Sequence, residues 1–337
     1  MTDFVVAEKS DGIRYLMVVG TSGQKGFCVL VNRKMQMYEV PIFANSDFFK
    51  GSVFDGEMVV ESLGRDQERQ KFLVYDLIAI HGETRRATHF LERYHEYFQI
   101  FDLDGKDILD HDMSKWESDA YELANTKAKI VCLGNKMALQ FAPKPFVQLI
   151  HVGSLWRSIP KLKHCSDGLV ITRVSAKIGT GTDPNILKWK ENHTIDLIIT
   201  CNYTKGKWLF RIFFQDNEKL VESTDRFFDL SGNKCMLRMS ENTILRSTCQ
   251  YYAETHKTQF SLIGECACKF ETSIDKTSAS DTAPPGTDSI IWCSVVKWRR
   301  DKYTPNNSTV IQRTLGNIID NVTIDELIQM TTKKMYS

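Results

Sequence analysis

The sequence predicts an α+β protein in which antiparallel sheets with flanking helices are followed by a smaller β-rich domain. Short apolar or alternating runs in the first half have the pattern of strands; they lie at 13–19, 27–31, 53–60 and 71–80. Helices are expected at 87–101 and around 115–128. Strand-like runs then resume at 168–174, 185–190, 194–201 and 207–214.

A change in organisation near residue 193 indicates a domain boundary. Several short strands follow within about 120 residues, which is typical of a small barrel such as an OB fold. We therefore expect a first domain over 1–193 and an OB-fold domain over 194–319. A final helix over 320–337 starts with the capping-box pair Thr323 and Glu326, and it can pack back on the first domain.

The composition is that of a folded globular protein, with 42% hydrophobic and 25% charged residues among 337. No stretch of about eighteen residues is uninterruptedly apolar, and no signal-peptide pattern opens the chain, so we expect no membrane association. Nine scattered cysteines suit the reduced thiols of a nuclear or cytosolic protein. The net charge of +1 argues against a protein that coats long nucleic acids.

Positive charge is nevertheless concentrated in one segment. Between Lys136 and Lys190 the chain has nine Lys or Arg residues against Asp167 and Asp183, a local excess of seven. A solvated face is the usual meaning of such a run. Here the charges lie within strand-like apolar segments, which favours a pocket for a polyanion.

The short motif KSDGIR, from Lys9 to Arg14, lies between two apparent strands. Asp-Gly is a common hairpin turn, and three further Asp-Gly pairs begin at 55, 104 and 167, so this pair alone has two interpretations. The full pattern K-x-D-G-x-R is rarer and is expected by chance in roughly one chain of this length in 200.

Further motifs follow in a fixed order: FDGEMV (54–59), FLVYDLIAI (72–80), SDGLVIT (166–172), ILKWKEN (186–192) and KWRRDKYTPNN (297–307). With the lysine first, the series resembles the covalent nucleotidyltransferases, the superfamily of ATP-dependent ligases and mRNA capping enzymes. It is most similar to the GTP:RNA guanylyltransferases of mRNA capping, because of R-x-D-K-x-x-P-N and LKWK. The resemblance covers about residues 5 to 307, and it makes the first domain a nucleotidyltransferase domain.

The residue types suit this chemistry. A lysine amine attacks only in its neutral form, which nearby cations favour. The resemblance implies that Lys9 attacks the α-phosphorus of GTP to give a lysyl-N–GMP and pyrophosphate, with Lys188, Lys190 and Arg14 supplying positive charge. The terminal phosphate of a diphosphate-ended RNA then takes the GMP to form GpppRNA. Such transfers depend on positioning and charge neutralisation.

The resemblance also assigns roles to single residues. Arg14 and Glu57 would bind the ribose and its surroundings, with Asp11 in the same nucleotide-binding motif. Tyr75 would stack on guanine, and Lys144 in FAPKPF would read guanine O6. Lys188 and Lys190 would hold the α-phosphate, and Glu57 and Asp167 would bind Mg²⁺ or Mn²⁺. The β- and γ-phosphates would be met by Arg299, Asp301 and Lys302. For residues such as Glu57 and Tyr75, a hairpin charge and a core aromatic are the alternatives.

The implied partners are GTP, a 5′-diphosphate RNA, a separate RNA triphosphatase chain and the tail of RNA polymerase II, in the nucleus. We find no Cys-x-x-x-x-x-Arg loop and no paired Glu-x-Glu strands of a triphosphatase. Two other functions remain open at this point: an ATP-dependent RNA or DNA ligase, and an inactive relative that binds RNA ends. The RRDKYTPN segment argues against the ligase, and the complete set of charged motif residues argues against the inactive binder.

Overall fold

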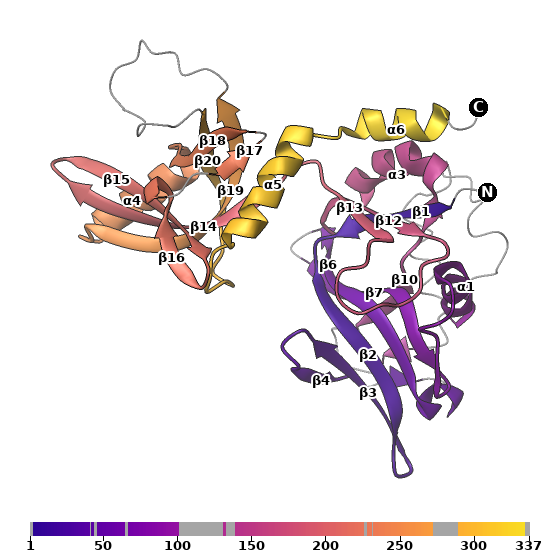
Figure 1. Cartoon of the computed structure of the whole chain (residues 1–337). Coiled ribbons are helices and arrows are strands. Elements are labelled where there is room, and N and C mark those ends of the chain that lie inside the picture. Colours follow the sequence, from indigo (N-terminus) through magenta and orange to yellow (C-terminus); the bar gives the residue numbers. More distant parts are fainter. Residues whose placement is uncertain are drawn as a thin grey trace. The chain divides into compact units, whose positions relative to one another are not determined.

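The computed structural model describes the chain apart from residues 1–2, 41, 44–45, 65–66, 101–130, 133–138, 226–227, 231, 272–288 and 334–337. The chain divides into two compact units. The first unit comprises Met1–Glu191 and Thr323–Ser337, and the second comprises Asn192–Val322. Figure 1 shows the elements of both.

The first unit is built on two main sheets. In a four-stranded sheet the order is β11 (Val147–Gln148), β1 (Phe4–Ser10), β12 (Ser166–Arg173) and β13 (Ile186–Trp189). In a seven-stranded sheet the order is β10 (Gln140–Pro143), β7 (Gln67–Ile80), β6 (Ser52–Gly64), β2 (Ile13–Ser22), β3 (Lys25–Asn32) and β4 (Met37–Glu39), with β8 (Glu83–Thr84) also paired to β7. A small pair joins β5 (Ile42–Phe43) to β9 (Val131–Cys132). All the main pairings except that of β10 with β7 are antiparallel.

Strands β1 and β2 belong to different sheets, although only Asp11 and Gly12 separate them. β1 pairs with β11 and β12, whereas β2 pairs with β3 and β6. The hairpin interpretation of the first Asp-Gly pair is therefore wrong. The motif instead carries the chain from one sheet to the other.

Helix α1 (Phe90–Ile100) packs beside β7 in the first unit (Figure 1). Phe90, Tyr94, Tyr97 and Phe98 recur at helical spacing and are buried in the main core of this unit. This helix confirms the one expected over 87–101. The helix expected around 115–128 lies outside the described residues.

Helices α3 (Val152–Ser158) and α6 (Ile324–Lys333) pack together in the first unit. Ile324, Leu327 and Ile328 of α6 join an apolar cluster that contains Val152 and Leu155 of α3. The expected capping box is present, because the Glu326 side chain accepts from the Thr323 N–H and the Thr323 hydroxyl accepts from the Glu326 N–H.

The second unit contains one seven-stranded sheet. Its order is β16 (Lys219–Glu222), β15 (Lys207–Asp216), β14 (Thr194–Thr204), β19 (Gln259–Glu271), β20 (Ser289–Trp298), β18 (Asn233–Met239) and β17 (Phe228–Leu230). Helices α4 (Thr243–Glu254) and α5 (Ser308–Asp320) pack on its core. No pairing between described strands joins β16 to β17, so the expected closed OB barrel is not confirmed. The α+β class itself is confirmed.

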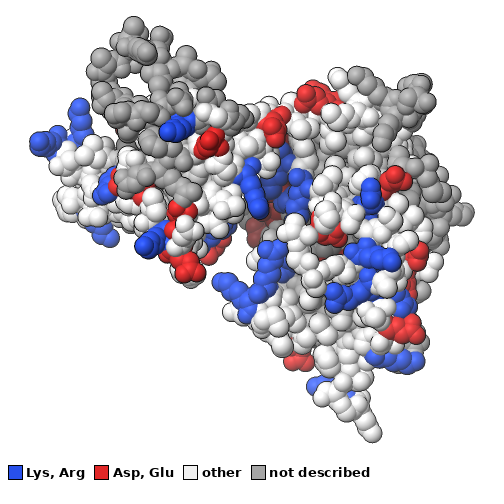
Figure 2. Space-filling model, viewed as in Figure 1, with Lys and Arg blue, Asp and Glu red and all other residues white. Residues whose placement is uncertain are grey.

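Two surface properties agree with the composition. On the face shown in Figure 2, Lys and Arg side chains form several separate groups with acidic side chains between them. None of the described helices is long and apolar enough to cross a membrane. Eight of the cysteines have described side chains, and none of these takes part in a disulfide.

Candidate active site

Lys9 and Lys190 share one carboxylate, that of Asp167. The Nζ of Lys9 lies 2.5 Å from Oδ1, and the Nζ of Lys190 lies 2.5 Å from Oδ2. Burial opposes ionisation of Asp167, but its hydrogen bonds and charge attraction to Lys190 and Lys9 outweigh this effect and lower its pKa. Asp167 therefore stays ionised and holds two lysines of different motifs together.

The backbone opposite Lys9 is irregular, and this irregularity directs Asp167. Glu8 pairs with Leu169 but Ser10 pairs with Ser166, so β12 contains one residue more than β1 over this interval. Gly168, within the bulge, has a φ of 151°, and a Cβ there would lie 2.0 Å from the carbonyl oxygen of Trp189. Only glycine fits this position.

Glu57 and Arg14 lie on the neighbouring strands β6 and β2 and are directly paired in register. The Gly12 N–H donates to Oε1 of Glu57 over 3.3 Å. A Cβ on Gly12 would lie 2.4 Å from the Met58 carbonyl oxygen, so glycine permits this close approach. Desolvation raises the pKa of Glu57, although Lys144, the Gly12 N–H and Lys9 act in the opposite direction.

Arg14 binds Asp55 through both ends of its guanidinium group. Its Nε donates to Oδ1 over 2.8 Å, and its Nη2 donates to Oδ2. Tyr75 lies beside this pair; burial first, and then the charge of Asp55, raise the pKa of its hydroxyl. The ring of Tyr75 packs at the edge of the main core. Tyr75 thus joins the arginine that the motif supplies to the core behind it.

Lys188 lies on β13, in register with Val170 of β12. Desolvation and the positive charges of Lys9, Arg33 and Arg14 lower its pKa. These four cations are therefore close enough to repel one another. Such a cluster is costly by itself and suits a polyanionic ligand.

A buried polar network lies directly beside Lys9. Oε1 of Glu8 is 2.7 Å from the Ser10 hydroxyl, 3.0 Å from Nζ of Lys144 and 3.1 Å from Nε2 of His164. The Lys144 ammonium also donates to the Ser10 hydroxyl over 2.6 Å. Burial alone would raise the pKa of Glu8, but Lys144, His164 and Ser10 lower it to about 2. Oε2 of Glu8 is buried and has no hydrogen-bond partner among the described residues.

Three predicted residues lie together in the second unit around Asp196. Arg299 is 3.3 Å from both Asp196 and Glu265, and 2.8 Å from Asp301. Lys302 also forms an ion pair with Asp196. The hydrogen bond to Asp301, opposed by desolvation and supported by these carboxylates, raises the pKa of Arg299.

The structure thus gathers most of the predicted residues of the first unit around Lys9. Asp11 lies at the entrance: it is exposed, and its N–H donates to the Cys165 carbonyl over 2.9 Å. Sequence reasoning missed five residues that belong to the same surroundings, which are Glu8, Ser10, Arg33, Asp55 and His164. The position of Glu8 and Ser10 on either side of Lys9 was the one available signal.

The residues fit a metal ion only in part. Among the described residues no group of three His, Cys, Asp or Glu side chains could hold one alone. Asp167 and Glu57 are two carboxylates that both interact with Lys9. Mg²⁺ commonly uses one or two carboxylates together with substrate phosphates and water, so this pair fits an ion that arrives with a nucleotide.

A lysine held against a carboxylate, amid further lysines and arginines, is the site of a protein that forms a covalent bond to a phosphorus atom. The family model of the mRNA capping enzyme catalytic domain matches residues 1–192. The chain belongs to this family of capping enzymes. This confirms the resemblance found in the ordered motifs.

Named relatives agree with the family. The mRNA-capping enzyme subunit alpha of Neurospora crassa is 30% identical over 219 residues, which is 60% of this chain and 49% of that protein. The subunit alpha of Saccharomyces cerevisiae is 22% identical over 377 residues, covering 96% of this chain and 73% of that protein. The chain therefore spans about half the length of the Neurospora relative. A solved mycobacterial DNA ligase D with ATP and MES aligns over 89% of this chain and 90% of its own, with 13% identity and a TM-score of 0.39.

Proposed function

We propose that this protein is an mRNA guanylyltransferase that transfers GMP from GTP, through a covalent bond to Lys9, to the 5′-diphosphate end of an RNA. The observation that carries the proposal is the shared carboxylate of Asp167, which binds both Lys9 and Lys190 within residues that match the capping family. An inactive RNA-end binder has no need for a lysine held in this way.

In the first step the Lys9 nitrogen, after losing its proton to solvent, attacks the α-phosphorus of GTP. A phosphorus–nitrogen bond forms, the bond to the oxygen that bridges to the β-phosphate breaks, and pyrophosphate leaves. The lowered pKa of Asp167 makes this carboxylate a group that orients Lys9 rather than one that retains its proton. Lys188 and Lys190 would stabilise the negative charge that develops on the α-phosphate.

In the second step a terminal oxygen of the RNA 5′-diphosphate attacks the same phosphorus. The bond to Lys9 breaks, and the lysine nitrogen regains a proton. Asp167 and Glu57 would hold Mg²⁺ or Mn²⁺, which supplies charge neutralisation for the phosphates when bound. Because both steps replace one group by another on phosphorus, positioning by these side chains is the main contribution of the protein.

Guanine recognition would depend on Lys144 and Tyr75. An ammonium can donate to guanine O6 but would face the amino group of adenine. The buried contacts of Lys144 with Glu8 and Ser10 support this role, because they hold the ammonium in one position. Arg299, Asp301 and Lys302 would bind the β- and γ-phosphates, from a second unit that we propose to be of the OB type.

The relatives are named as alpha subunits. By analogy we propose that a separate chain supplies RNA triphosphatase activity, and that the protein acts in the nucleus near the tail of RNA polymerase II. These partners follow from the reaction: guanylyl transfer needs a diphosphate end, which must come from a nascent triphosphate end.

The test is incubation of the purified protein with α-labelled GTP and a divalent metal, followed by denaturation. Label should stay on the chain, should be lost in acid and should survive base, because a phosphoramidate nitrogen leaves once it is protonated. Lys9→Arg should abolish labelling, while Lys25→Arg, an exposed change on β3, should leave it intact. Undiminished labelling of Lys9→Arg would overturn the assignment, and equal labelling by ATP would favour a ligase.

A further inference from the structure

A second candidate site lies in the second unit, where the core face of β15 is left partly uncovered. Ile212 and Phe214 point into the core and are buried. Trp208 and Phe210 lie on the same face, because strand side chains alternate, but they are only half-buried. The apolar face of this strand therefore extends beyond the core that covers it.

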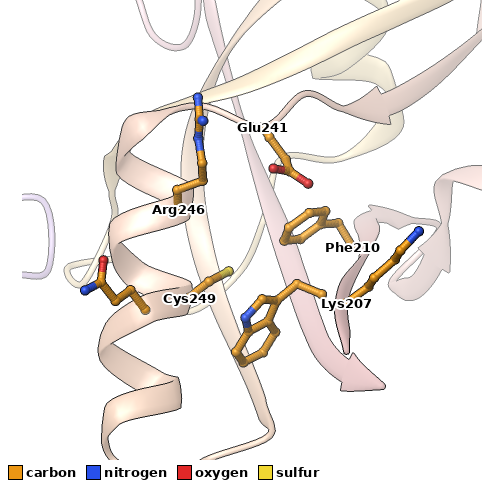
Figure 3. Close-up of a pocket in the computed structure, with 7 residues that line it drawn as sticks. Lys207, Phe210, Glu241, Arg246 and Cys249 are labelled. Carbon is orange, nitrogen blue, oxygen red and sulfur yellow. The ribbon is translucent and has the colours of Figure 1, made fainter. Parts of the chain in front are cut away.

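A pocket of about 420 Å³ occupies this uncovered region, between β15 and the first turns of α4. Its lining residues are Lys207, Trp208, Phe210, Glu241, Arg246, Cys249 and Gln250. In Figure 3 Cys249 points from α4 toward Phe210, with Arg246 and Glu241 on one side and Lys207 on the other. Burial raises the pKa of the Cys249 thiol, so the floor of the pocket is uncharged. The volume is within the range of small-ligand sites.

The surroundings of the pocket are mostly positive. Lys205 and Lys207 belong to the tight turn between β14 and β15, and both are exposed. Lys257 lies 5.6 Å from the ring of Tyr252. Neither Lys207 nor Arg246 has an ion-pair partner among the residues that the structure describes. Glu241 is the one carboxylate in the lining.

Aromatic side chains continue outward from the pocket. The ring of Tyr203 lies 5.3 Å from that of Trp208, and Tyr203 is 46% exposed. On its other side Trp208 packs 5.6 Å from Phe260 and is anchored to the core. A fixed, half-covered indole beside a phenyl ring is a stacking surface that needs little reordering on binding.

We propose that this pocket binds one nucleotide of the single-stranded acceptor RNA, with its base on Trp208 and Phe210 and its flanking phosphates on Lys207 and Arg246. The proposal rests on the proposed function, since RNA is the acceptor in that reaction. Aromatic rings between unpaired cations match the alternation of bases and phosphates in a single strand. An acidic peptide would use the cations but would leave the two aromatic faces without stacking partners.

The test is binding of a fluorescent, single-stranded RNA of twelve nucleotides with a 5′-hydroxyl end to the full chain. The 5′-hydroxyl end makes the signal report the RNA chain rather than its diphosphate. The double variant Lys207→Ala/Arg246→Ala should weaken binding about 10-fold at moderate salt and reduce the salt slope by about two, one for each lost phosphate contact. Phe210→Leu keeps the apolar volume but removes stacking, and it should weaken binding about fivefold without changing the salt slope.

Lys219→Ala is the matched control, because Lys219 is an exposed lysine that pairs with Asp216 at the opposite end of β15. It should alter binding less than twofold. Equal affinity for all these variants would overturn the proposal, and so would lost binding of an acidic peptide with unchanged RNA binding. Lys9 labelling by GTP should be normal in each variant. If even the unaltered chain fails to label, the proposed function fails, while the RNA affinities still decide this site.

Discussion

The ammonium of Lys9 lies 2.5 Å from Oδ1 of Asp167, a residue 158 positions further along the chain. The same carboxylate binds Lys190. Three charged residues from three motifs therefore form one unit on adjacent strands β1, β12 and β13. This unit is the part of the site most open to direct test.

Asp167→Asn keeps the shape of the side chain but removes its charge. We expect Lys9 labelling by GTP to fall about 100-fold, because Lys9 and Lys190 would repel each other without a shared carboxylate. The stability of the fold should change little, since Lys9 and Asp167 are 20% and 32% exposed and such pairs contribute weakly. The exposed Asp320→Asn change is the control for loss of one negative charge. Normal labelling of Asp167→Asn would show that the shared carboxylate is dispensable.

Gly168→Ala should damage both folding and labelling. A Cβ at this position would lie 2.0 Å from the Trp189 carbonyl oxygen, and φ is in a region that alanine avoids. We expect a loss of about 3 kcal/mol in the free energy of unfolding, measured by urea denaturation. Gly179→Ala is the matched control, because nothing lies within 4 Å of its Cβ position and its φ is not in that region. Similar unfolding curves for both variants would contradict the bulge geometry.

Glu8→Gln should remove a pH-dependent part of the stability. The pKa of Glu8 is about 2 in the folded chain against an ordinary value of 4.5. Because the folded value is the lower one, the stabilisation is fully present above about pH 4.5 and is lost as pH falls toward 2. The difference corresponds to roughly 3 kcal/mol. Urea unfolding of the unaltered chain and of Glu8→Gln should therefore differ by this amount near pH 6.

The difference between these two chains should shrink steadily between about pH 4.5 and pH 2. The exposed Glu68→Gln variant serves as the control, and its curve should follow that of the unaltered chain. A constant difference between Glu8→Gln and the unaltered chain across this range would mean that the Glu8 carboxylate is not held in its charged form.

Guanine preference should depend on Lys144. A site built to donate to O6 rejects the wrong base strongly, so we expect labelling by GTP to exceed labelling by ATP by roughly 10³-fold. Lys144→Met alone would leave Glu8 buried without its counter-charge. The double variant Glu8→Gln/Lys144→Met removes both charges and should fold, with the preference reduced to about 10-fold or less. An unchanged preference in the double variant would assign base recognition to other residues.

Arg299→Ala should separate the two half-reactions. Arg299 is predicted to contact the pyrophosphate that leaves, which is absent from the second step. Adduct formation should fall about 100-fold, whereas transfer of GMP from a preformed adduct to diphosphate-ended RNA should fall much less. Single-turnover measurements give each rate. Equal loss in both steps would indicate that Arg299 acts through its ion pairs with Asp196 and Glu265, as a support of the second unit.

Much of the local structure followed from the period of the sequence. The runs expected at 53–60, 71–80 and 207–214 are parts of β6, β7 and β15. The capping box of Thr323 and Glu326 begins a helix as expected. Such features depend on residues close together in the chain, where alternation and capping have direct physical causes.

Helices α4 and α5 were not expected, although each begins after an asparagine whose side chain caps it. Their apolar residues Leu245, Ile311 and Leu315 are few and widely spaced. Burial against the second sheet, rather than a strong local pattern, stabilises these helices. This contribution is invisible without the tertiary contacts.

The order of the charged motifs was sufficient to identify the family and to select Lys9, because covalent nucleotidyl transfer needs a lysine among cations and carboxylates wherever the chain places them. The tertiary structure decided which residues meet. Asp-Gly predicts a hairpin as readily as a crossover, and only the pairing of β1 with β12 and of β2 with β6 distinguishes the two. Glu8 and His164 are 156 positions apart and buried together. Their contact depends on packing between distant segments, and no local pattern of residues records it.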